Sequence, residues 1–247
     1  IVQYFFWHVF FWFALIFVGF RHEVGTDWGN YLSIWENRTD LFLEALVHTE
    51  PFYYILMYIV KQAGLSIHWL NLLTSSVAIT PIFYYLNKQK NQWIGFSCLI
   101  PVLFIITLMG YNRQAPAIGL VVWAVFRFLD KKLISSFFIL GLAALFHNSA
   151  IIMLPIVFGF TIRHSDWKVK ISVTAIMAIF VIYFLDSIIG RITLYTAGSL
   201  FSAGALPRIL LVDISLVLAL IYYKKLSQDE FQRQFILYFC ACGLFLS

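Results

Sequence analysis

The stretch that decides the fold is residues 133–162, LISSFFILGLAALFHNSAIIMLPIVFGFTI, in which two apolar runs flank a short polar turn. The runs at 133–147 and 149–162 hold about 15 and 14 residues, and as helices at about 1.5 Å per residue each extends roughly 21–22 Å. The hydrocarbon core of a bilayer is about 30 Å thick, so the turn stops below the far surface. Irregular backbone at that depth is tolerated only beside protein or a water-filled cavity. The stretch therefore predicts a recessed helical hairpin, with His147 near the floor of an outward-facing cavity.

The same apolar character extends over the whole chain. Hydrophobic residues make up 62% of it, charged residues 12%, and the mean hydropathy is +0.85, outside the range of soluble globular domains. Long runs without period-two alternation favour helices over barrel strands. They occupy 1–20, 67–86, 93–110, 114–129, 133–147, 149–162, 171–189, 208–223 and 235–247. We expect an all-α fold: a polytopic transmembrane helical bundle in which residues 1–247 form a single integral membrane domain, as a fragment truncated at both ends.

Lysines predict which gaps between these runs face the cytoplasm, because short cytoplasmic loops are rich in Lys and Arg. Lysine pairs stand in every second gap, at Lys88/Lys90, Lys131/Lys132, Lys168/Lys170 and Lys224/Lys225. The intervening gaps, with Arg21, Arg113 and Arg208, then lie outside. The segment Pro51–Gly64 is too short for a span, and counting it would invert every later loop. It is expected to be a juxtamembrane or re-entrant helix on the outer face.

Charge and cysteine usage exclude several classes of function. The net charge of +5 comes mostly from the lysines of the inner gaps, so a nucleic-acid partner is not expected. Cys98, Cys240 and Cys242 all lie within apolar runs. Cys240 and Cys242 are two residues apart on a helix and do not face each other, so neither a disulfide nor a metal site is expected.

Arg113 is the strongest candidate for binding an anion. The segment Tyr111-Asn112-Arg113-Gln114-Ala115-Pro116 precedes a helix that Pro116 is suited to begin. An arginine at an outward-facing helix N-terminus adds a full charge to the positive end of the helix dipole. Its guanidinium also matches phosphate oxygens in bidentate geometry. Snorkelling to lipid headgroups is the alternative.

Two further regions contain polar candidates. In the outer loop, Trp28 and Tyr31 offer stacking faces beside Asp27, an arrangement that suits carbohydrate, although a solvated acidic loop fits too. Arg208 opens another outer-side helix, and Asp213 lies deeper in that helix, where an ionisable residue is a functional candidate by default. At His147 an ordinary turn with Asn148 or Ser149 as the N-cap is the alternative to a site.

Four short motifs stand in order along residues 15–165, approximately. They are Arg21 with Val24-Gly25-Thr26-Asp27-Trp28-Gly29-Asn30-Tyr31, then Glu50-Pro51-Phe52, Asn112-Arg113-Gln114-Ala115 and Leu145-Phe146-His147-Asn148-Ser149-Ala150. In this order and spacing the sequence resembles the EpsG-like, Wzy-type family of bacterial polysaccharide polymerases (O-antigen, exopolysaccharide or capsule). The last third matches only in its hydrophobic pattern and in Arg208.

The resemblance implies a multi-pass enzyme of the bacterial cytoplasmic membrane, without nucleotide sugar, cofactor or required metal. It would join undecaprenyl-diphosphate-linked oligosaccharide repeats on the outer face. Its partners would be the lipid-linked oligosaccharide, membrane lipids, and chain-length regulator and flippase proteins. Two other functions stay open from the residues: a flippase or transporter of lipid-linked oligosaccharide, and a membrane O-acyltransferase acting on surface glycans.

The residues and the resemblance together suggest a role for each candidate. The donor's diphosphate gains charge as it leaves, and an arginine cluster would stabilise it. The candidates for binding the substrate and its diphosphate are Arg21, Arg113, Arg208, Gln114, Asn148 and Asp213. The catalytic candidates, among which a base should assist the acceptor hydroxyl, are Asp27, Glu50 and His147. His147 is equally suited to donate a hydrogen bond to the diphosphate, and Trp28 and Tyr31 are expected to contact the glycan.

Overall fold

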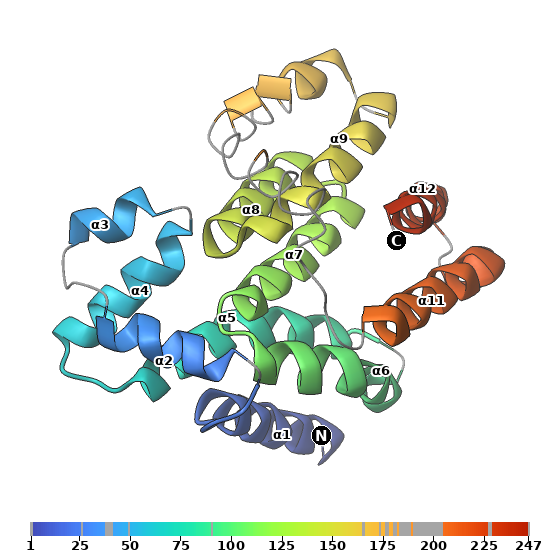
Figure 1. Cartoon of the computed structure of the whole chain (residues 1–247). Helices are drawn as coiled ribbons and strands as arrows, with labels where there is room; N and C mark the ends of the chain where they lie inside the picture. The colour runs from blue at the N-terminus through green and yellow to red at the C-terminus, as the bar shows by residue number, and fades with distance from the viewer. Residues whose placement is uncertain are drawn as a thin grey trace. The chain divides into compact units, whose positions relative to one another are not determined.

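The computed structural model describes residues 2–25, 27–37, 42–48, 50–89, 91–164, 166–172, 174–175, 178–179, 182, 189, 205–226 and 229–246. These residues form helices and no strand, which confirms the all-α prediction (Figure 1). The α-helices are α1 (Val2–Gly19), α2 (Trp28–Asn37), α3 (Phe42–Val47), α4 (Pro51–Gln62), α5 (Ile67–Leu86), α6 (Gln92–Leu99), α7 (Gln114–Leu129), α8 (Leu133–Phe146), α9 (Met153–His164), α11 (Ala205–Leu226) and α12 (Glu230–Leu246). A π-helix, η1 (Ile100–Leu108), continues α6, and a 3-10 helix, η2 (Asn148–Ile152), follows α8.

The chain forms two compact units, and residues make more contacts within each unit than with the other. The first comprises Ile1–Arg127 and Ser135–Ile151, and the second comprises Phe128–Ile134 and Ile152–Ser247. The first unit therefore contains every candidate residue except Arg208 and Asp213. The single domain over residues 1–247 stays a prediction.

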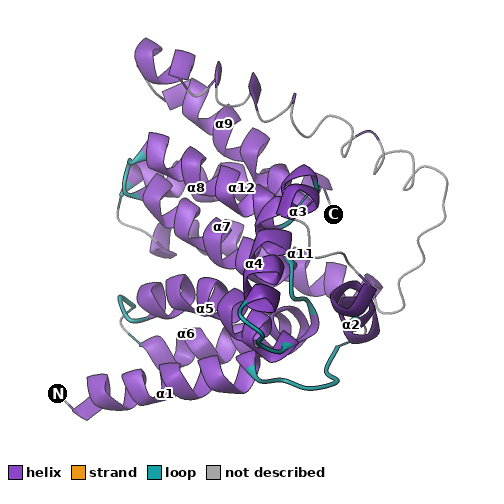
Figure 2. Cartoon of the chain, turned by 90° about the vertical axis from the view of Figure 1, so that its left-hand side faces the viewer, coloured by secondary structure: helices purple, strands orange, loops and turns teal. Residues whose placement is uncertain are grey.

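Aromatic side chains build the core of the first unit, where α1 packs against α5. Figure 2 shows the ribbons of α1, α5 and α6 near one another. The rings of Trp7 and Phe83 lie 4.8 Å apart, and Phe10 meets Phe96 edge to face at 4.7 Å. Phe104 of η1 continues the cluster, 4.7 Å from Phe96. Edge-to-face pairs of buried rings add to the hydrophobic stabilisation. This cluster holds α1, α5, α6 and η1 together.

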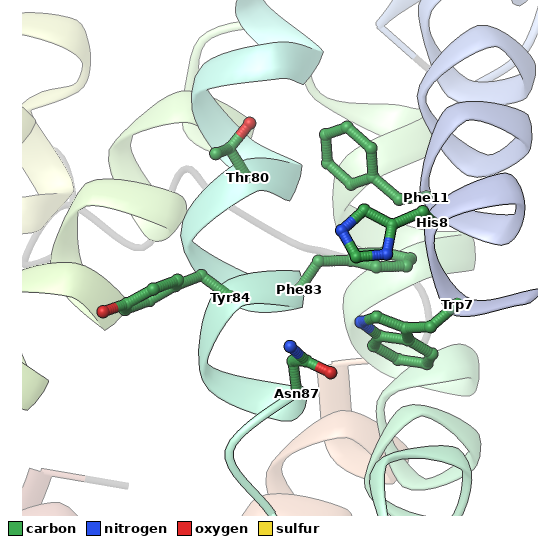
Figure 3. Close-up of a pocket in the computed structure, with 7 residues that line it drawn as sticks. All are labelled: Trp7, His8, Phe11, Thr80, Phe83, Tyr84 and Asn87. Carbon is green, nitrogen blue, oxygen red and sulfur yellow. The ribbon is translucent and has the colours of Figure 1, made fainter. Parts of the chain in front are cut away.

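A small cavity of about 210 Å³ borders this core between α1 and α5 (Figure 3). Its wall is formed by Trp7, His8, Phe11, Thr80, Phe83, Tyr84 and Asn87. None of the candidate residues lines this cavity.

In the second unit, α12 packs against α9 and α11. Phe160 lies at the centre of an aromatic group, with ring centroids 5.7 Å from Phe128 and 5.4 Å from Phe235. The absence of a side chain at Gly159 makes room for Tyr238, because a Cβ at this position would lie 2.3 Å from the Tyr238 hydroxyl oxygen.

Most of the predicted helices agree with the structure to within a few residues. The run at 67–86 is α5, the run at 114–129 is α7, and Pro51–Gly64 forms α4 over Pro51–Gln62. Among the described residues, no helix combines the length and the hydropathy needed to cross a bilayer. The run at 171–189 lies largely outside the described residues.

At two places the structure differs from what the apolar runs predicted. The outer segment 21–50, expected as a loop, contains α2 and α3. A sequence signal for α2 exists, since Trp28, Tyr31 and Trp35 recur at helical spacing. The turn at His147 is not an irregular loop but continues as the 3-10 helix η2.

Gly25 fixes the start of the outer segment against the residues that precede α7. Its φ of +95° is in the left-handed region, and a Cβ would lie 2.7 Å from the Gly110 Cα. We expect Gly25→Ala to destabilise the protein by about 1–3 kcal/mol, measured as a lower Tm of the purified protein. Gly29→Ala is the matched control, because a Cβ at Gly29 meets open space and the change should stay within about 1 kcal/mol. Equal Tm values for the two variants would contradict this role of Gly25.

Candidate functional site

Glu50 is the centre of a charged cluster in the first unit. Its side chain is only 4% exposed and lies immediately before Pro51, the first residue of α4. One carboxylate oxygen, Oε2, accepts a hydrogen bond from Arg113 Nη1 at 2.8 Å. The other, Oε1, is 2.5 Å from His147 Nδ1 and accepts the backbone N–H of Asn148 at 3.3 Å. The structure thus brings together four candidate residues from three distant segments.

Local backbone structure places each partner of this carboxylate. Arg113 directly precedes Gln114, the first residue of α7, and Pro116 lies in the first turn of that helix. The N–H of His147 donates to the carbonyl of Ala143 at 3.0 Å, which closes the last turn of α8. The backbone N–H of Asn148, the first residue of η2, donates to Glu50 Oε1 at 3.3 Å.

Electrostatics favour an ionised Glu50. Burial alone raises the pKa of this carboxyl, but the hydrogen bond and charge of His147, the charge of Arg113 and the Asn148 N–H together lower it below its ordinary value. The pKa of Arg113 is raised because Glu50 and Tyr31 outweigh the opposing effect of burial. At neutral pH the cluster therefore holds one carboxylate beside one guanidinium.

The contact with Glu50 sets the orientation of the His147 ring. With Nδ1 facing a carboxylate, the proton of the neutral imidazole belongs on Nδ1, and Nε2 is left as the acceptor. His147 is thus able to accept a proton at Nε2 or to donate a hydrogen bond from it.

Arg113 retains hydrogen-bonding capacity beyond its contact with Glu50. Its side chain is 28% exposed, and its Cζ lies 5.7 Å from the centre of the Tyr31 ring. The Nε atom is buried and has no hydrogen-bond partner among the described residues. A guanidinium with five N–H donors can hold Glu50 and an anionic ligand together.

Arg21 lies on a buried polar chain next to this cluster. The residue is 5% exposed and donates from Nη1 to the carbonyl of Val18 at 2.9 Å. Its Nη2 donates to Asn112 Oδ1, and Asn112 Nδ2 donates in turn to Asn71 Oδ1. Among the described residues no carboxylate pairs with it, and burial lowers the pKa of Arg21 to about 10. Asn112 directly precedes Arg113. The hydrogen bonds between Arg21, Asn112 and Asn71 therefore fix the backbone from which the Arg113 side chain extends.

The model of the EpsG family matches residues 4–247, nearly the whole chain. The chain belongs to the EpsG family. This confirms the EpsG-like resemblance and assigns the chain, at a coarse level, to polysaccharide biosynthesis as a glycosyltransferase-like polymerase. No curated protein and no solved structure matches it.

Three further candidates of this EpsG-family chain lie in the first unit, around the start of α2 and at the start of α7. Asp27 precedes α2, and its carbonyl accepts the Tyr31 N–H at 3.0 Å. Trp28 stacks on His68 at 6.1 Å and meets His22 edge to face at 5.6 Å. Gln114, half-buried, begins α7.

Two candidates belong to the second unit. Arg208 is in α11, but its side chain lies outside the described residues. Asp213, also in α11, has a buried Oδ1 without a hydrogen-bond partner among the described residues.

Asn71 and Asn112 are the residues that sequence reasoning missed as members of the site. Both are fully buried, and their amides connect Arg21 to α5. A signal for Asn71 exists: it is an amide within the apolar run 67–86, and a buried amide needs hydrogen-bond partners. Its partner, 41 residues away, cannot be read from that run.

Proposed function

We propose that this chain is a membrane-embedded polysaccharide polymerase. It transfers a growing glycan from undecaprenyl diphosphate to a lipid-linked oligosaccharide repeat on the outer face of the bacterial cytoplasmic membrane. The observation that carries this proposal is the cluster of Arg113, Glu50 and His147, which combines an anion receptor with a carboxylate-oriented imidazole. Membership of the EpsG family supports the polymerase class.

The proposed step is a displacement at the donor's anomeric carbon. A hydroxyl oxygen of the acceptor sugar forms the new C–O bond, and the bond from the anomeric carbon to the diphosphate oxygen breaks. The electron pair leaves with undecaprenyl diphosphate, whose negative charge therefore grows in the transition state. The proton of the acceptor hydroxyl passes to a base. Arg113 stabilises the departing diphosphate through N–H donors that Glu50 does not use.

We assign the base role to His147 rather than to Glu50. Both oxygens of Glu50 already accept hydrogen bonds and its side chain is buried, so it is a positioning residue. It holds Nδ1 of His147 and leaves Nε2 for the acceptor proton. Arg21 acts through Asn112 on the placement of Arg113.

The membrane part of the proposal rests on hydropathy and on exposed apolar side chains. Along α1 a row of large apolar residues exposes more than half of each residue's surface: Tyr4, Phe5, Phe6, Trp12, Phe13, Ile16 and Phe17. A patch of this kind is unusual on a protein surrounded by water and suits contact with lipid. The mean hydropathy of +0.85 agrees with this environment.

Membrane topology gives a direct prediction. If the lysine-rich gaps are cytoplasmic, single cysteines at Lys88 and Asn37, both exposed, should react with an impermeant maleimide from opposite sides of the membrane. Cys98, Cys240 and Cys242 are first replaced by serine so that background labelling is absent. Labelling of both positions from the same side would refute the topology.

Reconstitution tests the reaction itself. The purified chain in liposomes is supplied with a synthetic lipid-linked repeat, and products are separated by size. We expect a ladder of longer glycans and release of undecaprenyl diphosphate in proportion. Movement of the substrate across the bilayer without a ladder would indicate a flippase, and acylated repeats would indicate an acyltransferase.

A further inference from the structure

An apolar groove in the first unit adjoins the charged cluster. It has a volume of about 410 Å³ and is formed by α4, α5, α7 and α8. The residues that matter for the argument are Phe52, Val77, Pro81, Leu120, Leu142 and Phe146. None of the residues assigned above to the reaction lines this groove.

The groove and the charged cluster share two connections. Phe52 is two residues from Glu50 on α4, and Phe146 directly precedes His147 at the end of α8. The two rings meet edge to face with centroids 5.6 Å apart. One end of the apolar groove therefore lies at the residues that orient the carboxylate and the imidazole.

Close packing of α5 on α7 fixes the base of the groove. A Cβ at Gly119 would lie 2.5 Å from the Cα of Ala78 and 2.7 Å from the carbonyl oxygen of Val77, so the two backbones touch there. Pro81 lies within α5 and cannot donate a hydrogen bond to the carbonyl of Val77. Val77 and Leu120, the neighbours of this contact, line the groove. The base of the groove is thus fixed by contact between the backbones of α5 and α7.

We propose that this groove binds the isoprenoid chain of the lipid diphosphate, with the diphosphate at Arg113. This inference rests on the proposed function, and it adds a second subsite to it. Charge complementarity gives the direction: Arg113 pairs with Glu50, two residues before Phe52 at one end of the groove, and the groove beyond is apolar. A polyprenyl diphosphate is likewise charged at one end and apolar along the rest of its length. A volume of this size is typical of small-molecule sites, so the groove holds the isoprene units nearest the diphosphate.

Binding measurements on the full chain in detergent micelles test the subsite with three probes: inorganic diphosphate, farnesyl diphosphate and undecaprenyl diphosphate. Val77→Phe fills the groove from α5. Leu73→Phe is the matched control, since Leu73 is one turn earlier on the same helix, 39% exposed and outside the groove. We expect Val77→Phe to weaken both prenyl diphosphates by about tenfold and to leave inorganic diphosphate unchanged. Leu73→Phe should change none of the three.

A second variant, Leu142→Trp, fills the groove from α8 and replaces Val77→Phe if that protein does not fold, as judged by its Tm. Equal loss for all probes, or no loss, overturns the subsite. A competition result would also overturn the subsite: phosphatidylglycerol displaces farnesyl diphosphate as effectively as undecaprenyl diphosphate does. The groove would then hold ordinary lipid. The proposed function fails separately, if wild-type protein binds no diphosphate probe and Arg113→Lys changes nothing.

Discussion

Replacement of Arg113 by lysine is expected to lower the polymerisation rate by about 10²–10³-fold while the protein still folds. An ammonium preserves the charge beside Glu50 but supplies no planar fork that can hold the carboxylate and a diphosphate oxygen at the same time. The measurement is the initial rate of glycan elongation in liposomes, with the Tm as the test of folding.

The matched control for this variant is Arg127→Lys. Arg127 is near the other end of α7, where its Nε donates to Ser135 Oγ at 2.8 Å. We expect that variant to polymerise at a near wild-type rate. If Arg113→Lys does the same, Arg113 is an interfacial anchor, and the proposed diphosphate site is wrong.

Removal of the Glu50 charge should have an equally large effect, on both activity and stability. Glu50→Gln leaves Arg113 without its counter-charge and replaces one of the two acceptor oxygens, which face Arg113 and His147, by an NH2 donor. By comparison with carboxylate–histidine pairs in hydrolases we expect a fall in rate of about 10³–10⁴-fold. Breaking a fully buried ion pair costs about 3–5 kcal/mol, and because Arg113 is 28% exposed we expect a smaller loss here. The elongation rate and the free energy of unfolding measure the two effects separately.

The pH dependence of stability provides a second readout for Glu50. Its pKa is lower in the folded protein than in the unfolded chain. The stabilisation is therefore complete above the ordinary carboxyl pKa and is lost as pH falls towards the lower folded value. In Glu50→Gln the free energy of unfolding should therefore fall less steeply as pH is lowered. Glu23→Gln, at a side chain 74% exposed, is the control and should keep the wild-type slope at acid pH. A shallower slope in the control as well would point to a general charge effect.

The helices were predictable because apolar runs have recognisable lengths. The run at 67–86 matched α5 to the residue, and Pro116 marked the beginning of α7 within its first turn. Residues 28–37 were harder to predict, because α2 is a short amphipathic helix in a segment rich in charges. The choice between α-, 3-10 and π-helix at η1 and η2 depends on local packing, which hydropathy does not report.

The candidate site was predictable as a set of residue types, but its connections were not. Arg113 and His147 were singled out by their places at the ends of helices. That Glu50 joins them depends on how α4 lies against α7 and α8, and no periodic pattern encodes this. The amide chain through Asn71 and Asn112 was likewise hidden, since each amide looks like an isolated polar residue in its own run.

The hydrogen bonds of Glu50 span 63 residues to Arg113 and 98 residues to Asn148. Contacts this distant along the chain require large loops to close, and the free-energy cost of closing them is offset only when the contacts form. Non-local contacts of this kind slow folding. Activity should therefore return late during refolding, after most of the helix content. Its return would show that the entire first unit has reached its native packing. A nascent chain halted before His147 would already contain Arg21, Glu50 and Arg113, yet the Glu50 carboxylate would lack its histidine.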